Sequence, residues 1–175
     1  MDSVQLSPGR HNIISVPDME QGVISPQFPS SKRNAYNNLS VDVYESGECK
    51  SFYSIAIGES VTVLTGTYDL VFHTSSLTYV YDVIVEKDLP TNITIASPGS
   101  LMLQSNASGF GSIVDAITLE HVIQLPSGNP SGRYTLQPGT YTIIFRARRA
   151  RSSKYSIQST FTITSGSSLN LNLHD

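Results

Sequence analysis

A basic run near the C-terminus is the densest group of charges in the chain. It holds five of the eleven basic residues and no acidic residue: Arg146, Arg148, Arg149, Arg151 and Lys154. Alternate residues of a strand point to one face, so Arg146 and Arg148 are expected to share a face. Such a cluster is typical of a contact with an acidic protein, a glycan or lipopolysaccharide phosphate, or a nucleic acid. The alternative is a solubilising hairpin tip that discourages pairing between sheet edges.

Nucleic acid is the weakest of these partners. The whole chain has a net charge of −3, and no stacking aromatic residues are interleaved with the basic run. We therefore predict a protein or a surface glycan as the partner of this patch, and no nucleic acid.

Three tyrosines form a second candidate binding surface. Tyr79 and Tyr81 share one face of a predicted strand, and Tyr155 is expected at the corresponding place in a second unit. Sugar-binding proteins use flat aromatic platforms, and the chain has no Trp to supply one. Cross-strand packing is the alternative explanation for tyrosines on a sheet.

Residues with catalytic or metal-binding chemistry are scattered. The histidines are His11, His73, His121 and His174, and none shows metal-ligand spacing. Cys49 stands alone, without a neighbouring histidine that would activate it. Glu86 and Asp88 share a turn that could hold Ca²⁺, but no Asp-x-Asp-x-Asp loop supports a site there. We predict no catalytic, metal-binding or cofactor-binding residues.

No known catalytic loop occurs. The chain lacks a Gly-x-Ser-x-Gly elbow, and the glycine-rich stretch 109–112 lacks the strand-to-helix context of a phosphate loop, so we predict a turn there. Two acids distant in sequence could still form a glycosidase pair, although solvated acids at strand ends explain the scatter as well.

Two stretches with the sequence Gly-Thr-Tyr organise the elements. Residues 63–72 and 136–145 each run from a strand pattern through a turn into an apolar strand that ends in Phe. Gly66 and Gly139 are expected to supply the positive φ of the turn. Tyr68 and Tyr141 are expected to pack in the core.

The spacing of these stretches indicates a repeat of about 80 residues. Gly66 and Gly139 are 73 residues apart, whereas Val83 and Phe161 in the following strands are 78 apart. The difference predicts a five-residue insertion in the second unit's hairpin, at the basic run. Strands of one type near positions 13, 93 and 171 close the units, and the last two of them alternate strictly.

The repeat predicts an all-β fold of two tandem, small, antiparallel β-sandwich-like modules at 18–96 and 97–175. Residues 1–17 contain a strand at 12–16, which is either left from a preceding module or opens the first one. With no signal peptide at the start, the first reading makes the chain the C-terminal part of a longer secreted protein. A charged content of only 14 % and the absence of an apolar run of eighteen residues fit short strands without membrane insertion.

The second unit carries a family resemblance. Residues 136–141, 146–148, 154–157 and 161–167 resemble the β-rich C-terminal repeats that follow von Willebrand factor type A domains in some secreted bacterial proteins. The pattern is also loosely similar to PEGA-type and carboxypeptidase-regulatory-like modules, with Thr65 in place of the proline in the first unit. The resemblance implies an envelope or surface role without catalysis. No Asp-x-Ser-x-Ser metal motif occurs, so a metal-dependent adhesion domain would lie outside this chain.

These observations predict a non-catalytic structural or adhesive accessory region of a larger exported bacterial protein. Its expected location is extracellular, at the cell surface or in the periplasm. The first alternative is a carbohydrate-binding module that uses the tyrosine faces and the basic tip. The second alternative is a hydrolase with dispersed acids.

Overall fold

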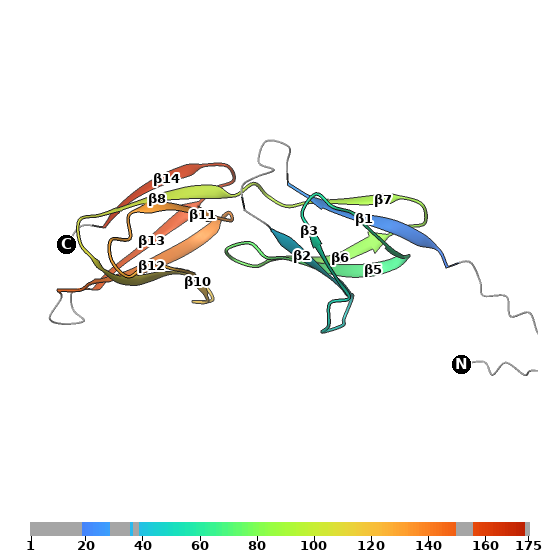
Figure 1. Ribbon diagram of the computed structural model, residues 1–175, viewed down its shortest axis with the longest axis horizontal. Coiled ribbons are helices and arrows are strands. Elements are labelled where there is room, and N and C mark those ends of the chain that lie inside the picture. The colour runs from blue at the N-terminus through green and yellow to red at the C-terminus, as the bar shows by residue number, and fades with distance from the viewer. Residues whose placement is uncertain (1–18, 29–35, 37–38, 150–155, 174–175) are drawn as a thin grey trace, which may run out of the picture.

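In the part of the chain that the structure describes, the fold is all-β and the strands form two modules of seven strands each (Figure 1). The computed structural model describes residues 19–28, 36, 39–149 and 156–173. The predicted strand at 12–16, Tyr155, Arg151 and Lys154 lie outside the described residues. Within them there is no helix with the length and hydropathy that crossing a bilayer requires.

The strands follow one another in the same order in both modules. The first module consists of β1 (Gln21–Gln27), β2 (Ser40–Glu45), β3 (Tyr53–Ala56), β4 (Val61–Leu64), β5 (Gly66–Phe72), β6 (Thr78–Val85) and β7 (Pro90–Thr94). The second consists of β8 (Gly99–Ser105), β9 (Gly109–Asp115), β10 (His121–Gln124), β11 (Gly132–Leu136), β12 (Gly139–Ala147), β13 (Ser156–Ile163) and β14 (Ser168–Leu173).

Each module is a sandwich of a three-stranded and a four-stranded sheet. The sheet orders are β4-β1-β7 and β3-β2-β5-β6 in the first module, and β11-β8-β14 and β10-β9-β12-β13 in the second. Adding seven to each strand number converts one module into the other, which confirms the tandem repeat. The closing strands β7 and β14 pair in parallel with the opening strands β1 and β8, while the other pairs are antiparallel.

Each module has its own hydrophobic core. Alternation along the strands places one face of each sheet inward, as in β5, where Tyr68, Leu70 and Phe72 are buried. The equivalent residues of β12 are Tyr141, Ile143 and Phe145, which are buried as well. The buried residues fall into two clusters that share no member.

The predicted insertion lies in the β12–β13 hairpin. Tyr68 pairs with Val83, fifteen residues later, whereas Tyr141 pairs with Phe161, twenty residues later, which gives the five extra residues. The register of β5 and β6 also shifts between Tyr68 and Leu70, so that β6 contains a bulge that β13 lacks. The second hairpin is therefore longer toward its tip than the sequence offset alone indicates.

The prediction that Gly66 and Gly139 adopt a positive φ is wrong. The glycines with positive φ are Gly47, Gly58, Gly128 and Gly166, whereas Gly66 and Gly139 open β5 and β12 in extended backbone. A Cβ at Gly139 would lie 3.2 Å from the Tyr141 hydroxyl oxygen. The glycine at this position leaves room for the tyrosine side chain two residues later.

The prediction of a turn at 109–112 is also wrong, because these residues begin β9. A Cβ at Gly109 would lie 2.2 Å from the Arg146 carbonyl oxygen, and one at Gly111 would lie 2.5 Å from the Ile144 carbonyl oxygen. The glycines allow β9 and β12 to approach closely. The strand predicted at 113–117 is present as far as Asp115, after which the chain turns.

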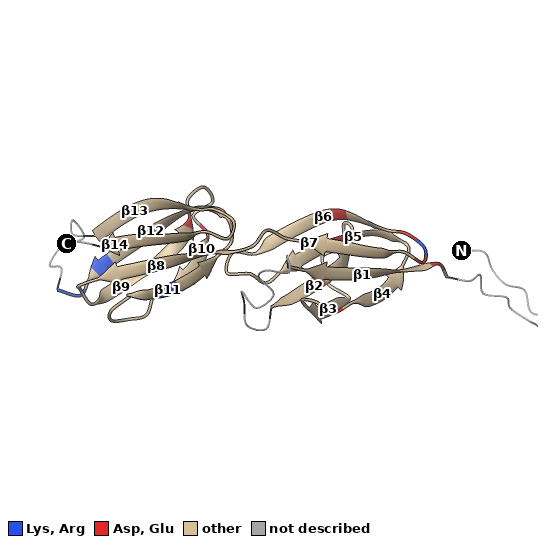
Figure 2. Cartoon of the chain, turned by 90° about the horizontal axis from the view of Figure 1, so that it is seen from above, with Lys and Arg blue, Asp and Glu red and all other residues tan. Residues whose placement is uncertain are grey.

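The modules lie end to end (Figures 1 and 2), joined by residues 95–98. The hairpin tip between β5 and β6 contacts the second module, where the Ser75 hydroxyl donates a hydrogen bond to the Thr135 carbonyl oxygen at 2.8 Å. On the other side of the linker, the Ser165 hydroxyl and the Gly166 amide both donate to the Ser97 carbonyl oxygen.

Candidate functional site

A tyrosine hydrogen bond closes the bend that leads into a strand at three places, before β5, β11 and β12. The hydroxyls of Tyr68, Tyr134 and Tyr141 donate to backbone carbonyl oxygens four residues earlier, at 2.8, 2.7 and 2.8 Å. This arrangement is the tyrosine corner known from β-sandwiches. Each tyrosine follows a glycine by two residues, a pattern that is visible in the sequence at 66–68, 132–134 and 139–141. Sequence reasoning assigned Tyr68 and Tyr141 to packing and missed this role.

The basic cluster lies at the end of the second module that faces away from the first (Figure 2). Arg146 is exposed on β12, opposite Phe110 of β9. The Arg148 guanidinium lies 5.3 Å from the centre of the Phe110 ring, within the range of a cation–π contact. Arg148 and Arg146 therefore flank the same aromatic ring.

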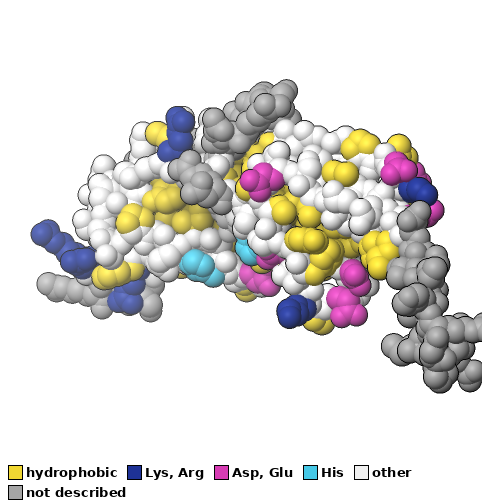
Figure 3. Space-filling model, turned by 45° about the vertical axis from the view of Figure 1, so that its right-hand side comes forward, with side chains coloured by type: hydrophobic (Ala, Val, Ile, Leu, Met, Phe, Trp, Pro, Cys, Tyr) yellow, Lys and Arg dark blue, Asp and Glu magenta, His cyan; other side chains and the backbone are white. Residues whose placement is uncertain are grey.

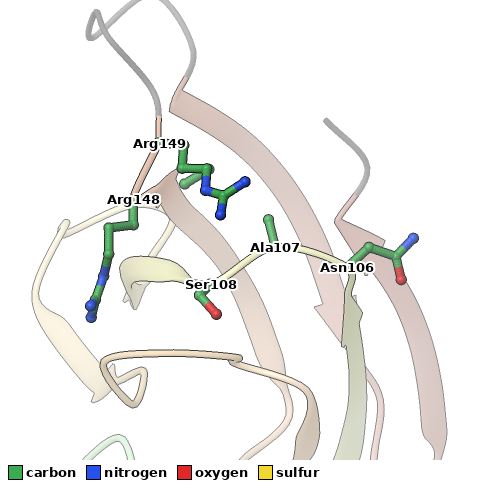
Figure 4. A pocket seen from close by; sticks show the side chains of 6 residues that line it. Asn106, Ala107, Ser108, Arg148 and Arg149 are labelled. Carbon is green, nitrogen blue, oxygen red and sulfur yellow. The ribbon is translucent and has the colours of Figure 1, made fainter.

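A depression of about 630 Å³ lies beside this cluster (Figure 4). Its lining is Asn106, Ala107, Ser108, Ala147, Arg148 and Arg149. The Arg148 amide donates a hydrogen bond to the Ser108 carbonyl oxygen at 2.8 Å, which ties the end of β12 to the β8–β9 loop. The described part of the predicted patch is thus an open, cationic surface on a fixed backbone, and its role in binding stays a prediction.

The tyrosine face lies on β6, an edge strand of the first module. Tyr79 and Tyr81 are 50 % and 63 % exposed, and their rings lie 5.8 Å apart at an interplanar angle of 8°. At the bulge, Asp82 has a φ of 56° and its amide donates a hydrogen bond to the Asp69 carboxylate. Because the bulge adds one residue, exposed Ile84 also returns to the face of the two tyrosines.

A carboxylate–imidazole pair lies close to these tyrosines. His73 Nε2 and Asp42 Oδ2 are 2.7 Å apart. Across the sheet, Asp42 of β2 pairs with Val71 of β5, which in turn pairs with Tyr79 of β6. Burial alone would raise the pKa of Asp42, but hydrogen bonds from His73 and Ser54 lower it below its usual value. The first module thus presents parallel aromatic rings beside polar side chains.

The second module has no such aromatic face among its described residues. The register position of Tyr79 is taken by Gln158 on β13, and Thr160 lies opposite Thr142, the repeat equivalent of Asp69 at the bulge. Threonine hydroxyls pair across the strands there, as in the 3.1 Å contact between Thr142 and Thr160. Two modules with one topology therefore carry different outer faces.

The acids, the histidines and Cys49 form no metal-binding group in the described residues. No group of three or more His, Cys, Asp or Glu side chains that could hold a metal ion occurs in that part of the chain. Cys49 is exposed in the β2–β3 loop, and His121 is exposed at the start of β10. Backbone hydrogen bonds from Thr118 and Ile117 lower the pKa of Asp115, and that of Asp42 is lowered too, whereas a glycosidase acid needs a raised pKa.

The junction between the modules buries a second set of polar side chains. Gln137 and Tyr141 are buried there, and burial raises the pKa of Tyr141 to about 12, with smaller effects of Tyr36 and Asp115. The Tyr36 hydroxyl and Gln137 Nε2 are both buried in this contact, and Ser75 and Gln137 are the polar side chains close to Tyr36. The sequence contains no local signal for this contact, since its residues come from both modules.

Comparisons with known proteins find only distant structural similarity. No protein-family model and no curated protein matches the chain. Among solved structures, the minor pilin of Streptococcus agalactiae shows 11 % identity over 88 % of this chain and 94 % of its own, with a TM-score of 0.40. A Bacteroides ovatus protein described as an adhesin shows 8 % identity over 95 % and 98 %, with a TM-score of 0.38.

The TIE protein of Bacillus anthracis is similar at 11 % identity and a TM-score of 0.35, and the match spans 88 % of this chain but 34 % of that protein. At these TM-scores the likenesses carry no argument about function. They show no link to von Willebrand factor or PEGA repeats.

Proposed function

We propose that the chain is a non-catalytic structural or adhesive part of an exported protein and acts as a stiff two-module spacer. The observation that carries the proposal is the junction. The Ser75 hydrogen bond to Thr135 and the burial of Gln137 and Tyr141 fix the second module on the tip of the first. Pilin and adhesin are also the descriptions of two similar structures, but at TM-scores of 0.40 and 0.38 the proposal depends on the junction.

Small-angle X-ray scattering tests the stiffness. At about 500 mM salt, where charge attraction between chains is screened, the wild-type chain is expected to scatter as a single elongated particle. Ser75→Lys places a long charged side chain in the junction and is expected to broaden the distribution of interatomic distances. Ser46→Lys is the matched control, because Ser46 is exposed at the opposite end of the first module. A wild-type profile that requires a broad ensemble of bent shapes would contradict the spacer role.

A glycan-binding role is the second candidate, favoured by the parallel, exposed rings of Tyr79 and Tyr81 beside polar side chains. On a glycan array, Tyr79→Ala with Tyr81→Ala should abolish binding, while Tyr53→Ala, at a similarly exposed tyrosine outside this face, should not. Neutralising Arg148 and Arg149 tests the basic tip in the same assay. If glycan binding is unchanged after either substitution, the substituted surface is not part of the glycan-binding site.

A further inference from the structure

The two ends of the molecule carry opposite charge. Residues 19–96 hold nine acidic and four basic residues, whereas residues 97–175 hold three acidic and six basic ones. Figure 3 shows Asp and Glu side chains gathered on the first module, and Lys and Arg at the far end of the second. A chain polarised in this way attracts a second copy when the ends face each other.

The loops at the free end of the first module bring the acids together. These acids are Glu20, Glu45, Glu48, Glu86 and Asp88. Backbone hydrogen bonds join their segments, from Thr65 to the Glu20 carbonyl oxygen, from Asp88 to that of Gln21 and from Ser46 to that of Thr67. The negative charge of Glu20 is balanced by Lys87, whose Nζ lies 3.2 Å from Glu20 Oε1.

An apolar corner lies within this acidic end. Leu64, whose carbonyl oxygen accepts the hydrogen bond of the Tyr68 hydroxyl, is 45 % exposed. Phe52 packs against Tyr53 and Tyr68, with ring centres 5.0 and 5.7 Å apart, and it remains exposed. Leu89 is exposed at the same end.

In the second module the equivalent corner is covered. Gln137 accepts the Tyr141 hydrogen bond as Leu64 accepts that of Tyr68, but Gln137 is only 6 % exposed. The cover is the first module, whose β5–β6 hairpin tip is held there through Ser75. The molecule thus contains one example of a hairpin end docked on a tyrosine corner.

We propose that a second copy of this chain docks the basic end of its second module on the acidic corner of the first, head to tail. The β12–β13 hairpin is the repeat equivalent of the β5–β6 hairpin, and Arg146, Arg148 and Arg149 stand at its base. The contact joins the free Leu64 corner to these arginines. Such a heterologous contact does not close on itself, so it extends into linear chains. It goes beyond the spacer role, which scattering from monomeric variants still tests separately.

Sedimentation velocity at rising protein concentration tests the association. At about 20 mM salt the wild-type chain should form species larger than a dimer, and about 500 mM salt should dissociate them, because the ion pairs are screened. Arg148→Glu should weaken association at least about tenfold. Arg133→Glu, which makes the same charge change at an exposed site on β11, should not.

Mixing two blocked chains tests the head-to-tail geometry. Leu64→Arg blocks the acidic corner, and Arg148→Glu with Arg149→Glu blocks the basic end. Each chain alone should be monomeric. The mixture should form dimers and nothing larger, because the intact basic end of the first variant can bind the intact acidic corner of the second, and no other intact pair remains. Glu48→Arg is a second block of the corner in case Leu64→Arg does not fold, and circular dichroism checks each variant.

Two results would overturn the proposal. One is a wild-type chain that stays monomeric up to about 1 mM at low salt. The other is association that survives both blocks, which would place the contact elsewhere, such as on the Tyr79 and Tyr81 face.

Discussion

At the scale of single residues, the Gly-x-Tyr pattern explains the two stretches that dominate the sequence. At Gly139 a Cβ would crowd the Tyr141 hydroxyl, and in both stretches the tyrosine hydroxyl satisfies a backbone carbonyl oxygen at the strand corner. A buried hydrogen bond of this kind contributes about 1 kcal/mol, and leaving its acceptor unpaired costs more.

Tyr141→Phe is therefore expected to lower the free energy of unfolding by about 1–2 kcal/mol. The phenyl ring keeps the packing, so the loss reports the hydrogen bond to Gln137. Tyr79→Phe is the control, since Tyr79 is half exposed, and it should change stability by less than about 0.5 kcal/mol. Urea unfolding of both variants measures the difference, and equal losses would argue against the corner.

The buried tyrosines predict a loss of stability at alkaline pH. Burial raises the pKa of Tyr141 to about 12 and also raises that of Tyr36 and Tyr134, from an ordinary value of 10.0. Below pH 10 both the folded and the unfolded states are protonated. Above it the unfolded state ionises first, so the ionisation of Tyr141 lowers the free energy of unfolding between pH 10 and 12, by up to about 1.4 kcal/mol per pH unit, and Tyr36 and Tyr134 act in the same direction.

Urea unfolding at several pH values between 8 and 12 measures this slope. Tyr141→Phe should make it shallower, whereas Tyr79→Phe should leave it unchanged. A free energy of unfolding that stays constant to pH 12 would contradict the linkage.

At the scale of elements, β9 shows that two closely spaced glycines can lie in a strand and not in a turn. Two glycines within four residues are typical of a turn, yet β9 pairs with β10 on one side and with β12 on the other. Gly109 also exchanges backbone hydrogen bonds with Gly128, at 2.8 and 3.1 Å. The close approach of β12, which lies some thirty residues later, decides the conformation.

Gly109→Ala is expected to destabilise the protein by about 1–3 kcal/mol, because the new Cβ meets the Arg146 carbonyl oxygen and the Phe145 ring. Gly66→Ala is the control, where the nearest atom lies at 3.7 Å, an ordinary contact. The control should be neutral or gain up to about 1 kcal/mol from reduced freedom of the unfolded chain. Thermal unfolding compares the two, and a tolerated Gly109→Ala would show that β9 can move away from β12.

At the scale of the whole molecule, two separate cores are joined by a short linker and a largely polar junction. Hydrophobic burial is the main stabilising contribution within each core, and it does not extend from one core to the other. The modules are therefore expected to unfold in two distinguishable steps.

Leu70→Ala and Ile143→Ala test this expectation at equivalent, fully buried positions of β5 and β12. Each should cost about 2–5 kcal/mol in its own module. In calorimetry the two variants should lower different transitions. If both variants lower one shared transition by the same amount, the junction couples the modules into a single cooperative unit.

The sequence by itself determined the fold class, the repeat and the hairpin insertion. These features depend on alternation, turn residues and spacing, which are properties of neighbouring residues. The Tyr79–Tyr81 face was also predictable, because residues two apart on a strand share a face.

Only the tertiary structure decided which surfaces are free. Leu64 and Gln137 occupy the same place in the repeat, yet one is exposed and the other is buried by a neighbouring module. The same holds for the close contact of Gly109 with β12, the parallel pairing of the closing strands, and the gathering of the acidic loops at one end of the first module. All four depend on residues far apart in the chain, and no local pattern records where the fold brings them together.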